Sequence, residues 1–419
     1  MKKLIKLKLK ILSGLILKKY QPKVIAVTGS IGKTGSREAV YTVLSGKYTV
    51  RRSCKDKSSD LEVFLTIIGF AGGDRGLTSL TQAVFKAVSI LIFKDNDYPQ
   101  ILILEINADK QGTINKMLKN IKPYIGIITF AGRIYSDYFK NIEEATKEKS
   151  MLFSALNKND WAVFNADDKN ILKFKKNIKA QTLSYGFNKS CDITANNIRF
   201  TYVEDDDDIE NLRGLSLKIN YQGATVPIFL PNSLSIGQVY AALSAIAVGI
   251  IYGLNLVEIA ERLRVFETPK GRSVLLSGIK ESVIIDDSYE AFLESVEASL
   301  DVLTKIPIKK SHRRIAVIGD MSAPGADIIK NHQIIGKKIA ALEVDLLFLV
   351  GEKSRDIARA AKKAGMKENS IKHYAFAKMA GEDIKNIIKS GDLILVSGSS
   401  KVKMETVVKN IMANPEKAK

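Results

Sequence analysis

The stretch Gly29–Thr34, GSIGKT, is the part of this sequence most suited to chemistry, because it combines two glycines with a lysine and a threonine. It follows the β-branched run KVIAVT at 23–28, and a helical pattern runs on to about Ser45. In such a loop, glycines let backbone amides surround phosphates, the lysine reaches the β and γ oxygens, and the threonine hydroxyl meets Mg²⁺. The spacing is shorter than in the common GxxxxGKS/T loop, so a structural glycine turn is the alternative. We predict a nucleotide site formed by Gly29, Ser30, Gly32, Lys33 and Thr34.

The elements that must hold this loop alternate between apolar strand runs and helical stretches. Further runs occur at 101–105 (ILILE), 124–129 (YIGIIT) and 161–164 (WAVF). This alternation predicts an α/β fold with a mostly parallel sheet, in a central P-loop-type ATPase domain. From about 182 to 229 the pattern changes to short alternating strands around the acidic run at 204–208, which we expect to be a solvated hairpin tip.

A second α/β unit is expected after a helical region at 235–264, because Pro269 and Gly271 mark a boundary. Its apolar runs predict a C-terminal Rossmann-like domain with strands at 283–286, 314–318, 345–350 and 392–396. The predicted organisation is an extension at 1–22, a central domain at 23–268 and a C-terminal domain at 269–419. Residues 233–257 have no charge, but polar side chains interrupt the run, which favours a buried helix over a membrane span.

The charge balance favours polyanionic partners, namely nucleotides, nucleic acid or an anionic membrane surface. Lysine and arginine total 64 against 45 acids, a net charge of +19. Residues 1–23 hold eight lysines and no acid, so the rest of the chain carries 19 − 8 = +11. Residues 1–20 mix leucine, isoleucine and lysine at nearly helical spacing, which predicts either a helix on an anionic membrane or a lysine-flanked helix packed on the domain behind it.

The cysteine content suits a reducing compartment, and we expect a cytosolic protein. Cys54 and Cys191 show no metal-binding spacing, and two cysteines are few for 419 residues. A monomer is expected.

The GxxGKT loop resembles that of the Mur ligases, and further stretches resemble this family in the same order. Residues 101–112 (ILILEINADKQG) match the strand whose glutamate helps to hold Mg²⁺, which corresponds to Glu105. Residues 144–168 match the segment with a lysine that is carbamylated in several members, which corresponds to Lys149. Later matches resemble the member that adds D-alanyl-D-alanine to a cell-wall peptide precursor: Gly271-Arg272, DDSY at 286–289, GDM at 319–321, His332 and SGSSKVKME at 397–405.

The resemblance implies an ATP-dependent amide ligase that activates a carboxylate as an acyl phosphate for attack by an amine. The substrates would be a cell-wall peptide precursor and an amino acid or dipeptide. Lys33, Glu105 and Lys149 would be catalytic, and Thr34, Glu105 and a carbamate on Lys149 would supply the oxygen ligands that Mg²⁺ prefers. Arg272 and Asp287 would serve the nucleotide from across an interdomain cleft.

Each of these assignments has a structural alternative. Glu105 would then be a rim acid, Lys149 a surface lysine, and Asp286-Asp287 a helix cap. His332 is expected to be a structural hydrogen-bonding residue.

Several positions depart from the family pattern. The metal-associated histidine falls at Tyr135, with Asp137 as a substitute, and an Asn-Asn pair is replaced by Ser58-Ser59 with Glu62 at the glycine position. The asparagine after DDSY is Glu290, and the lysine of the KGS motif is Ser397. The domain that grips the uridine nucleotide is also expected to be lacking.

These departures motivate a second hypothesis, a nucleotide-binding but catalytically impaired paralogue with a regulatory or scaffolding role. A third, a nucleic-acid-dependent ATPase, rests on net charge and lacks an aromatic-basic motif, so no specific nucleic acid is expected.

Overall fold

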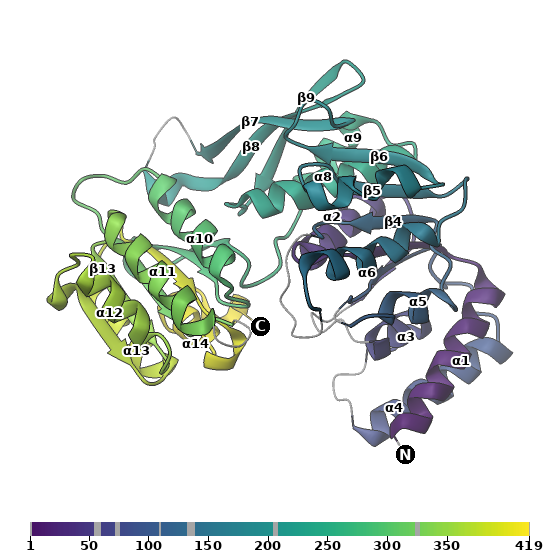
Figure 1. Cartoon of the computed structure of the whole chain (residues 1–419), viewed down its shortest axis with the longest axis horizontal. Coiled ribbons are helices and arrows are strands. Elements are labelled where there is room, and N and C mark those ends of the chain that lie inside the picture. The colour runs from purple at the N-terminus through teal and green to yellow at the C-terminus, as the bar shows by residue number, and fades with distance from the viewer. Residues whose placement is uncertain are drawn as a thin grey trace. The chain divides into compact units, whose positions relative to one another are not determined.

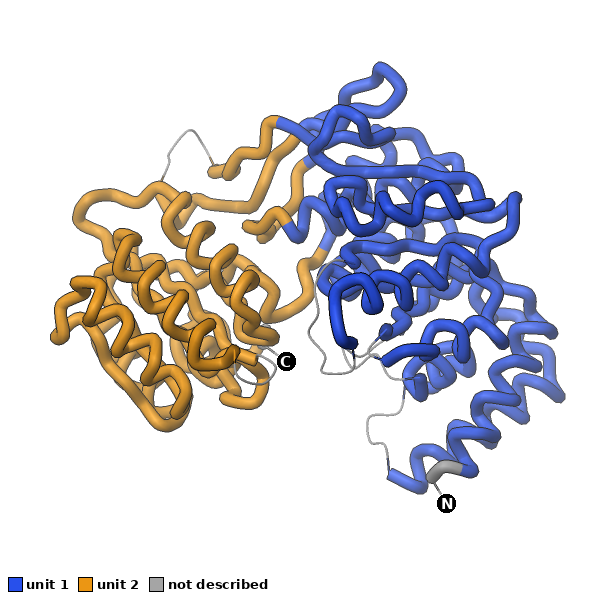
Figure 2. Tube along the Cα trace, viewed as in Figure 1, with its two compact units in different colours: residues 1–196, 218–228, 237–266 blue, residues 197–217, 229–236, 267–419 orange. Residues whose placement is uncertain are grey.

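The computed structural model describes residues 2–53, 60–71, 76–108, 110–131, 139–203, 208–322 and 327–418. The chain divides into two compact units (Figure 2). Unit 1 comprises residues 1–196, 218–228 and 237–266, and unit 2 comprises residues 197–217, 229–236 and 267–419. In this division residues 1–22 group with unit 1, and residues 197–217 and 229–236, predicted for the central domain, group with unit 2.

A nine-stranded sheet runs in the order β2-β3-β1-β4-β5-β6-β7-β8-β9. The pairs from β2 to β7 are parallel, as predicted. A two-residue turn at Gln222-Gly223 joins β8 to β9, and both residues have positive φ (46° and 81°), as hairpin turns of type I′ require. The strands are β1 (Lys23–Thr28), β2 (Val50–Arg52), β3 (Ile101–Glu105), β4 (Ile125–Ile128), β5 (Trp161–Asn165), β6 (Gln181–Gly186), β7 (Ile193–Tyr202), β8 (Leu212–Tyr221) and β9 (Ala224–Pro231).

Helices connect the parallel strands from β1 to β6 (Figure 1). Apolar residues of β1, β3, β4 and β5 are buried on both faces, as in parallel sheets covered by helices. The helices are α1 (Lys2–Tyr20), α2 (Lys33–Ser45), α3 (Asp60–Ile68), α4 (Leu77–Ile92), α5 (Thr113–Leu118), α6 (Ile142–Ser154), α7 (Lys169–Leu172), α8 (Ile236–Ile251) and α9 (Leu256–Leu263). Two short 3₁₀ turns are η1 (Lys175–Asn177) and η2 (Ile209–Asn211).

The uncharged stretch 233–257 is a buried helix, as predicted. Most of α8 is buried, from Gln238 to Gly249. The expected single helical region at 235–264 is two helices, because the chain turns at Gly253 (φ 74°) and the Asn255 side chain caps α9 by accepting from the Glu258 amide. Among the described helices, none is long and apolar enough to cross a bilayer.

The sheet of unit 2 has six strands in the order β10-β11-β15-β12-β13-β14, with β10 antiparallel and the others parallel. The four predicted strands correspond to β11, β12, β13 and β15. The elements are β10 (Val274–Ser277), β11 (Val283–Asp287), β12 (Arg314–Gly319), β13 (Leu346–Val350), β14 (Ile371–Tyr374), β15 (Leu393–Ser397), α10 (Leu293–Lys305), α11 (Asp327–Ala341), α12 (Arg355–Lys363), α13 (Ala377–Ile387), α14 (Glu405–Ile411), and the 3₁₀ turns η3 (Ile279–Glu281), η4 (Glu368–Ser370), η5 (Ser400–Val402) and η6 (Pro415–Ala418).

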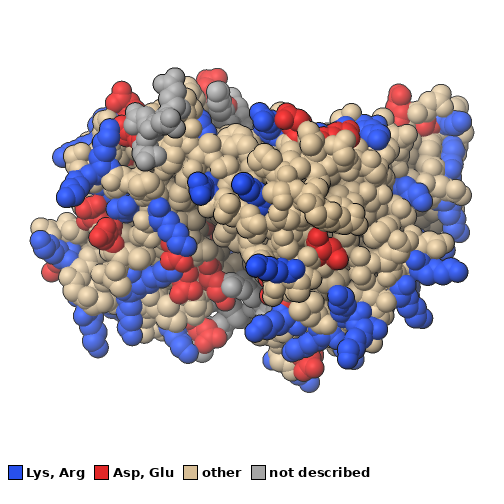
Figure 3. Space-filling model, turned by 90° about the horizontal axis from the view of Figure 1, so that it is seen from above, with Lys and Arg blue, Asp and Glu red and all other residues tan. Residues whose placement is uncertain are grey.

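Basic and acidic side chains are mixed on one face of the molecule. On the face seen in Figure 3, acidic side chains lie among the lysine and arginine side chains. Of the acidic run at 204–208, all but Asp208 lies outside the described residues. Asp208 caps η2 and pairs with Lys309.

Candidate active site

The loop at 29–32 joins the carboxyl end of β1 to α2, and the end of β4 holds it in place. The Ser30 amide donates to Phe130 O at 2.7 Å, and the Thr129 hydroxyl donates to Ile31 O at 2.6 Å. In parallel sheets, ligands bind at the carboxyl ends of strands, where helix N-termini also point. The loop therefore lies where an anion is most favoured.

Two glycines have conformational reasons to be glycine. Gly32 has a φ of 81°, in the left-handed region that glycine adopts without strain. At Gly29, a Cβ atom would lie 2.0 Å from Thr129 Oγ1 and 3.1 Å from the Phe130 backbone. The loop therefore requires both glycines, and its backbone can approach a ligand closely.

Lys33, the first residue of α2, donates its ammonium group to carbonyl oxygens of its own loop. Lys33 Nζ lies 2.9 Å from Gly29 O and 3.4 Å from Ser30 O. These neutral partners hold the cation at the loop without neutralising its charge. The charge therefore remains available for a phosphate.

Thr34 and Glu105 form the buried polar contact of the site. Thr34 Oγ1 lies 3.3 Å from Glu105 Oε2, and each residue is only 3% exposed. Glu105 ends β3, next to β1 in the sheet, so the sheet order brings these residues together across 71 positions. Glu105 is thus not an exposed rim acid. In this arrangement a buried carboxylate and a hydroxyl lie directly beside the phosphate-binding loop.

Arg37 was not singled out from the sequence, yet it completes this cluster. Its Nη1 lies 3.2 Å from Glu105 Oε2, and its Nη2 lies 2.7 Å from Glu38 Oε1. Glu38 in turn pairs with Arg52 at 2.6 Å. Buried charges need partners, and each of these side chains has one. The available signal was helical spacing, since Arg37 follows Thr34 by three residues and shares its face of α2.

Lys149 is buried in α6 and is not a surface lysine. It is 4% exposed, and its Nζ lies 3.2 Å from Ala145 O and 5.8 Å from the centre of the Phe139 ring. One turn earlier, the Thr146 hydroxyl donates to Ala131 O just beyond β4. Lys149 therefore lies near the same strand end that supports the phosphate-binding loop.

The residue before Lys149 has a separate role. Glu148 is 3% exposed and accepts hydrogen bonds from the Gly112 and Ile114 amides at 2.8 Å. It thereby caps α5, where a negative charge is favoured. Asp168 similarly accepts from the Ala131 amide at 2.7 Å, which ties the turn after β5 to the end of β4.

In unit 2, the Gly271-Arg272 and DDSY motifs form one structure. The Gly271 amide donates to Asp286 Oδ2 at 3.2 Å, and the Tyr289 amide donates to Gly271 O at 3.1 Å. Arg272 lies over the Tyr289 ring at 4.7 Å and pairs with Glu290 at 3.5 Å. Glu290, which departs from the family pattern, therefore partly neutralises the predicted nucleotide-binding arginine.

Asp287 is a buried carboxylate surrounded by hydroxyl groups. Ser273 donates to its Oδ1 at 3.1 Å, while Ser299 and Ser397 donate to Oδ2 at 2.7 Å and 3.3 Å. Burial raises the pKa of Asp287 to about 6, although the hydroxyls of Ser299 and Ser273 lower it. Neither Asp287 nor Asp286 caps a helix. Ser397, at the position of the family lysine, supplies only a neutral partner.

This raised pKa predicts a pH-dependent stability. Between its ordinary pKa of 3.8 and about 6, Asp287 holds a proton in the folded chain that it loses on unfolding. Stability should therefore fall as pH rises through this window, by on the order of a few kcal/mol. The Asp287→Asn variant should lack this pH-dependent contribution to stability. Thermal unfolding of both proteins at pH 4, 5, 6 and 7 measures the difference. An unchanged pH profile in the variant would contradict the assignment.

His332 is structural, as expected. Its Nδ1 donates to Ile328 O at 2.7 Å, and its Nε2 accepts from the Met321 amide at 3.1 Å. It thereby holds the GDM turn in place.

The structure describes only some of the other positions that the sequence analysis singled out. Tyr135, Asp137, Ser58, Ser59 and Cys54 lie outside the described residues. Glu62 is buried in α3, and Cys191 is a buried free thiol.

The chain belongs to the Mur ligase family. Residues 27–228 match the Mur ligase middle domain, and residues 271–400 match the Mur ligase, glutamate ligase domain. The predicted family and α/β fold are confirmed, and the protein is an ATP-dependent ligase.

Within this family, the chain is similar to ligases of the MurF kind. It is 25% identical over 413 residues to the UDP-N-acetylmuramoyl-tripeptide--D-alanyl-D-alanine ligase of Buchnera aphidicola, covering 97% of this chain and 80% of that one. The fold is similar to MurF from Acinetobacter baumannii, with a TM-score of 0.78, 21% identity and coverage of 96% and 79%. MurF from Thermotoga maritima, solved in complex with ADP, gives a TM-score of 0.75 at 21% identity, with coverage of 99% and 85%. The similarity to these ligases does not favour the hypothesis of a catalytically impaired paralogue.

Proposed function

We propose that this protein joins D-alanyl-D-alanine, or a similar amine, to the peptide carboxylate of a muramoyl-tripeptide precursor, with ATP as the energy source. The named substrates are those of the similar ligases. The observation that carries the proposal is the buried Thr34–Glu105 pair beside a loop whose lysine donates to two carbonyl oxygens of that loop. Such an arrangement suits phosphoryl transfer, where catalysis is mainly positioning and charge neutralisation.

The residues of the loop explain the first step. The amides of the loop and the ammonium group of Lys33 bind the β- and γ-phosphates, so Lys33 exchanges its carbonyl partners for phosphate oxygens. A precursor carboxylate oxygen then attacks the γ-phosphorus, and ADP leaves. The amine attacks the acyl carbon of the resulting acyl phosphate, phosphate leaves with the carboxylate oxygen, and the amine loses a proton.

Mg²⁺ fits the donor set of this site. Among the described residues, no group of three or more acidic, histidine or cysteine side chains is placed to hold a metal ion alone. Mg²⁺ is usually held by one or two carboxylates together with substrate phosphates, and Thr34, Glu105 and a carbamate on Lys149 would be its protein ligands. When bound, it would neutralise phosphate charge. A carbamate would also convert a buried cation into an anion beside the loop.

The proposal is tested by phosphate release from Mg-ATP with the tripeptide precursor and D-alanyl-D-alanine each omitted in turn. Release that requires both substrates supports the proposed reaction. Release with one substrate alone, or with neither, contradicts it. ATP binding without release in any combination would instead favour the impaired paralogue.

Arg272 and Asp287 remain predicted nucleotide-binding residues, and Glu290 offers a test of Arg272. The Arg272–Glu290 pair is partly exposed, with 28% and 50% of the side chains accessible, so it contributes at most about 1 kcal/mol. Replacing Glu290 by the family's asparagine would leave Arg272 with one anionic partner fewer to compete with the nucleotide. We expect Glu290→Asn to lower the KM for ATP about two- to fivefold.

Steady-state kinetics measure this effect, with Glu343→Gln as control. Glu343 is a 93% exposed acid of unit 2 that pairs weakly with Arg314. An equal change in both variants would reflect general charge, and an unchanged KM in Glu290→Asn would remove the support for Arg272.

Contact with a membrane through residues 1–20 is also proposed. The alternative, a lysine-flanked helix packed on unit 1, is what the structure describes for one face of α1, since Leu9 and Ile16 are fully buried. On the opposite face of α1, Leu4, Leu7, Ile11 and Leu15 are exposed, and this face would make the membrane contact.

A further inference from the structure

Helix α1 is apolar on two opposite faces. Leu9, Ser13 and Ile16 are buried in unit 1, together with the partly buried Ile5 and Leu12. Leu4, Leu7, Ile11 and Leu15 recur every three or four residues, so they form a second stripe, and they are 45% to 58% exposed. A helix that serves only to cover a domain needs one apolar face. The second stripe therefore requires another explanation.

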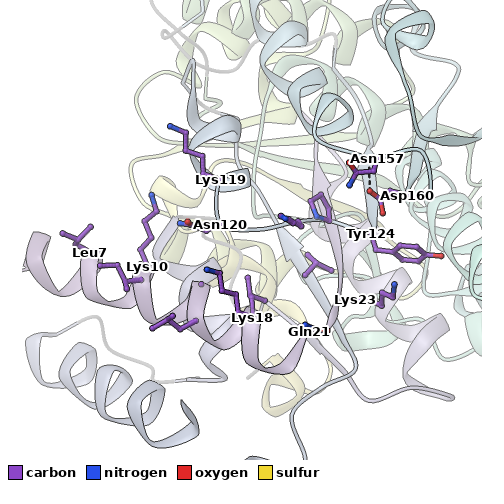
Figure 4. A pocket seen from close by; sticks show the side chains of 18 residues that line it. Leu7, Lys10, Lys18, Gln21, Lys23, Lys119, Asn120, Tyr124, Asn157 and Asp160 are labelled. Atoms are coloured by element: carbon purple, nitrogen blue, oxygen red, sulfur yellow. Dashed lines mark hydrogen bonds between the residues drawn. The ribbon is translucent and has the colours of Figure 1, made fainter. Parts of the chain in front are cut away.

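Leu7, Ile11 and Leu15 of this second stripe line a groove of about 840 Å³. Figure 4 shows Leu7, Lys10 and Lys18 along α1, with Lys119, Asn120 and Tyr124 from the segment before β4. The groove lies at the amino ends of β1 and β4, whereas the phosphate-binding loop lies at the carboxyl ends of these strands. It is thus separate from the candidate active site.

The rim of the groove is strongly cationic. Among the described residues that line it are Lys10, Lys18, Lys23, Lys119 and Lys122, against one carboxylate, that of Asp160, which already accepts from the Asn157 amide. Within the described part of the chain, Lys10, Lys18, Lys119 and Lys122 have no ion-pair partner. An apolar floor between unpaired lysines complements a surface that is apolar inside and anionic at its boundary.

The neighbouring helix α4 also exposes large apolar side chains. It contacts α1 through Lys19, whose Nζ donates to Ile90 O and Leu91 O at 2.9 Å. Of the large apolar side chains exposed among the described residues, half belong to α1 and to α4 with its C-cap Phe93. Large exposed apolar patches mark interaction sites, and these side chains lie on two helices that contact each other.

We propose that the outer face of α1, with the segment 119–124, docks on an anionic lipid bilayer. Leu4, Leu7, Ile11 and Leu15 would enter the boundary of the acyl chains, while the flanking lysines would extend to lipid phosphates. The inner face of α1 stays packed on unit 1, so docking requires no unfolding. The inference goes beyond the proposed ligase activity, because no group of the active site takes part.

The test is flotation of the full chain with vesicles of neutral phosphatidylcholine, or of an equimolar mixture with phosphatidylglycerol. The chain should float only with the anionic vesicles, and less at high salt. Leu7→Ser with Ile11→Ser, and Lys10→Gln with Lys18→Gln, should each lower the bound fraction by about tenfold or more. All these side chains are at least partly exposed, so thermal unfolding and ATP turnover in solution should be unchanged.

Matched controls use exposed residues elsewhere in unit 1. Val257→Ser with Val265→Ser changes two valines that are 61% and 73% exposed, and Lys173→Gln with Lys176→Gln changes two exposed lysines. Both control pairs should bind vesicles like the unchanged chain. Equal losses in controls and α1 variants would overturn the proposed face.

Other occupants of the groove give different results. Absence of flotation with anionic vesicles would overturn the proposal. So would release from vesicles by millimolar inorganic phosphate, which would indicate a site for soluble anions. A dimer in size-exclusion chromatography that the Leu7 and Ile11 changes dissociate, without vesicle binding, would assign the face to a second copy of the chain.

Discussion

Replacing Lys33 by alanine is expected to lower kcat for ligation by on the order of a thousandfold, because the variant lacks the cation that would neutralise the transferring phosphate. The fold should survive. Among the described residues, Lys33 donates to two carbonyls of its own loop, and such bonds contribute about 1 kcal/mol each. Product formation at saturating substrates, together with thermal unfolding, measures both effects.

The control for this variant is Lys47→Ala, which removes an exposed lysine just beyond the end of α2. It lowers the net charge equally and should leave kcat unchanged. If Lys33→Ala retained more than a tenth of the activity, the loop would not be the site of phosphoryl transfer.

Replacing Glu105 by glutamine is expected to lower kcat about a hundredfold and to raise the Mg²⁺ concentration needed for half-maximal activity. Glutamine keeps the shape and can still accept from Thr34 and Arg37, but it removes the charge that a cation needs. Glu105→Ala would confuse this result, because it would leave Arg37 short of a partner in a buried site.

Glu38→Gln is the matched control for Glu105→Gln. Glu38 also pairs with Arg37, at 2.7 Å, whereas the Thr34 hydroxyl donates to Glu105. This variant should lose stability without a change in the Mg²⁺ requirement. A Glu105→Gln enzyme with the ordinary Mg²⁺ dependence would show that Glu105 serves only to pair Arg37.

The strands that carry the site were predictable because they are buried runs with clear ends. The predicted runs at 23–28 and 101–105 coincide with β1 and β3, where β-branched and leucine residues stop at a glycine turn or a charged residue. By contrast, β2 (VRR) and β14 (IKHY) were missed, since short strands at sheet edges carry charged residues and show no apolar pattern.

Some site residues were likewise predictable from local sequence, and others were not. Lys33 and Thr34 belong to a local motif, whose backbone conformation follows from its glycines. The Glu105 contacts with Thr34 and Arg37 depend on sheet order, which brings together residues far apart in sequence, and local patterns do not encode it. Glu148 was overlooked beside Lys149 because adjacent charged residues on a helix give no sign of which is buried. The resemblance to the family, rather than spacing, singled out Glu105, Lys149 and Asp287.

This chain is proposed to activate a carboxylate by phosphorylation. The most direct measurement uses a precursor labelled with ¹⁸O in the reacting carboxylate, with mass analysis of the phosphate released during ligation. Attack of that carboxylate on the γ-phosphorus, followed by attack of the amine on the acyl carbon, predicts one ¹⁸O atom in each phosphate. Phosphate without ¹⁸O, formed while the amide product accumulates, would contradict the acyl phosphate and the role assigned to the loop at Lys33.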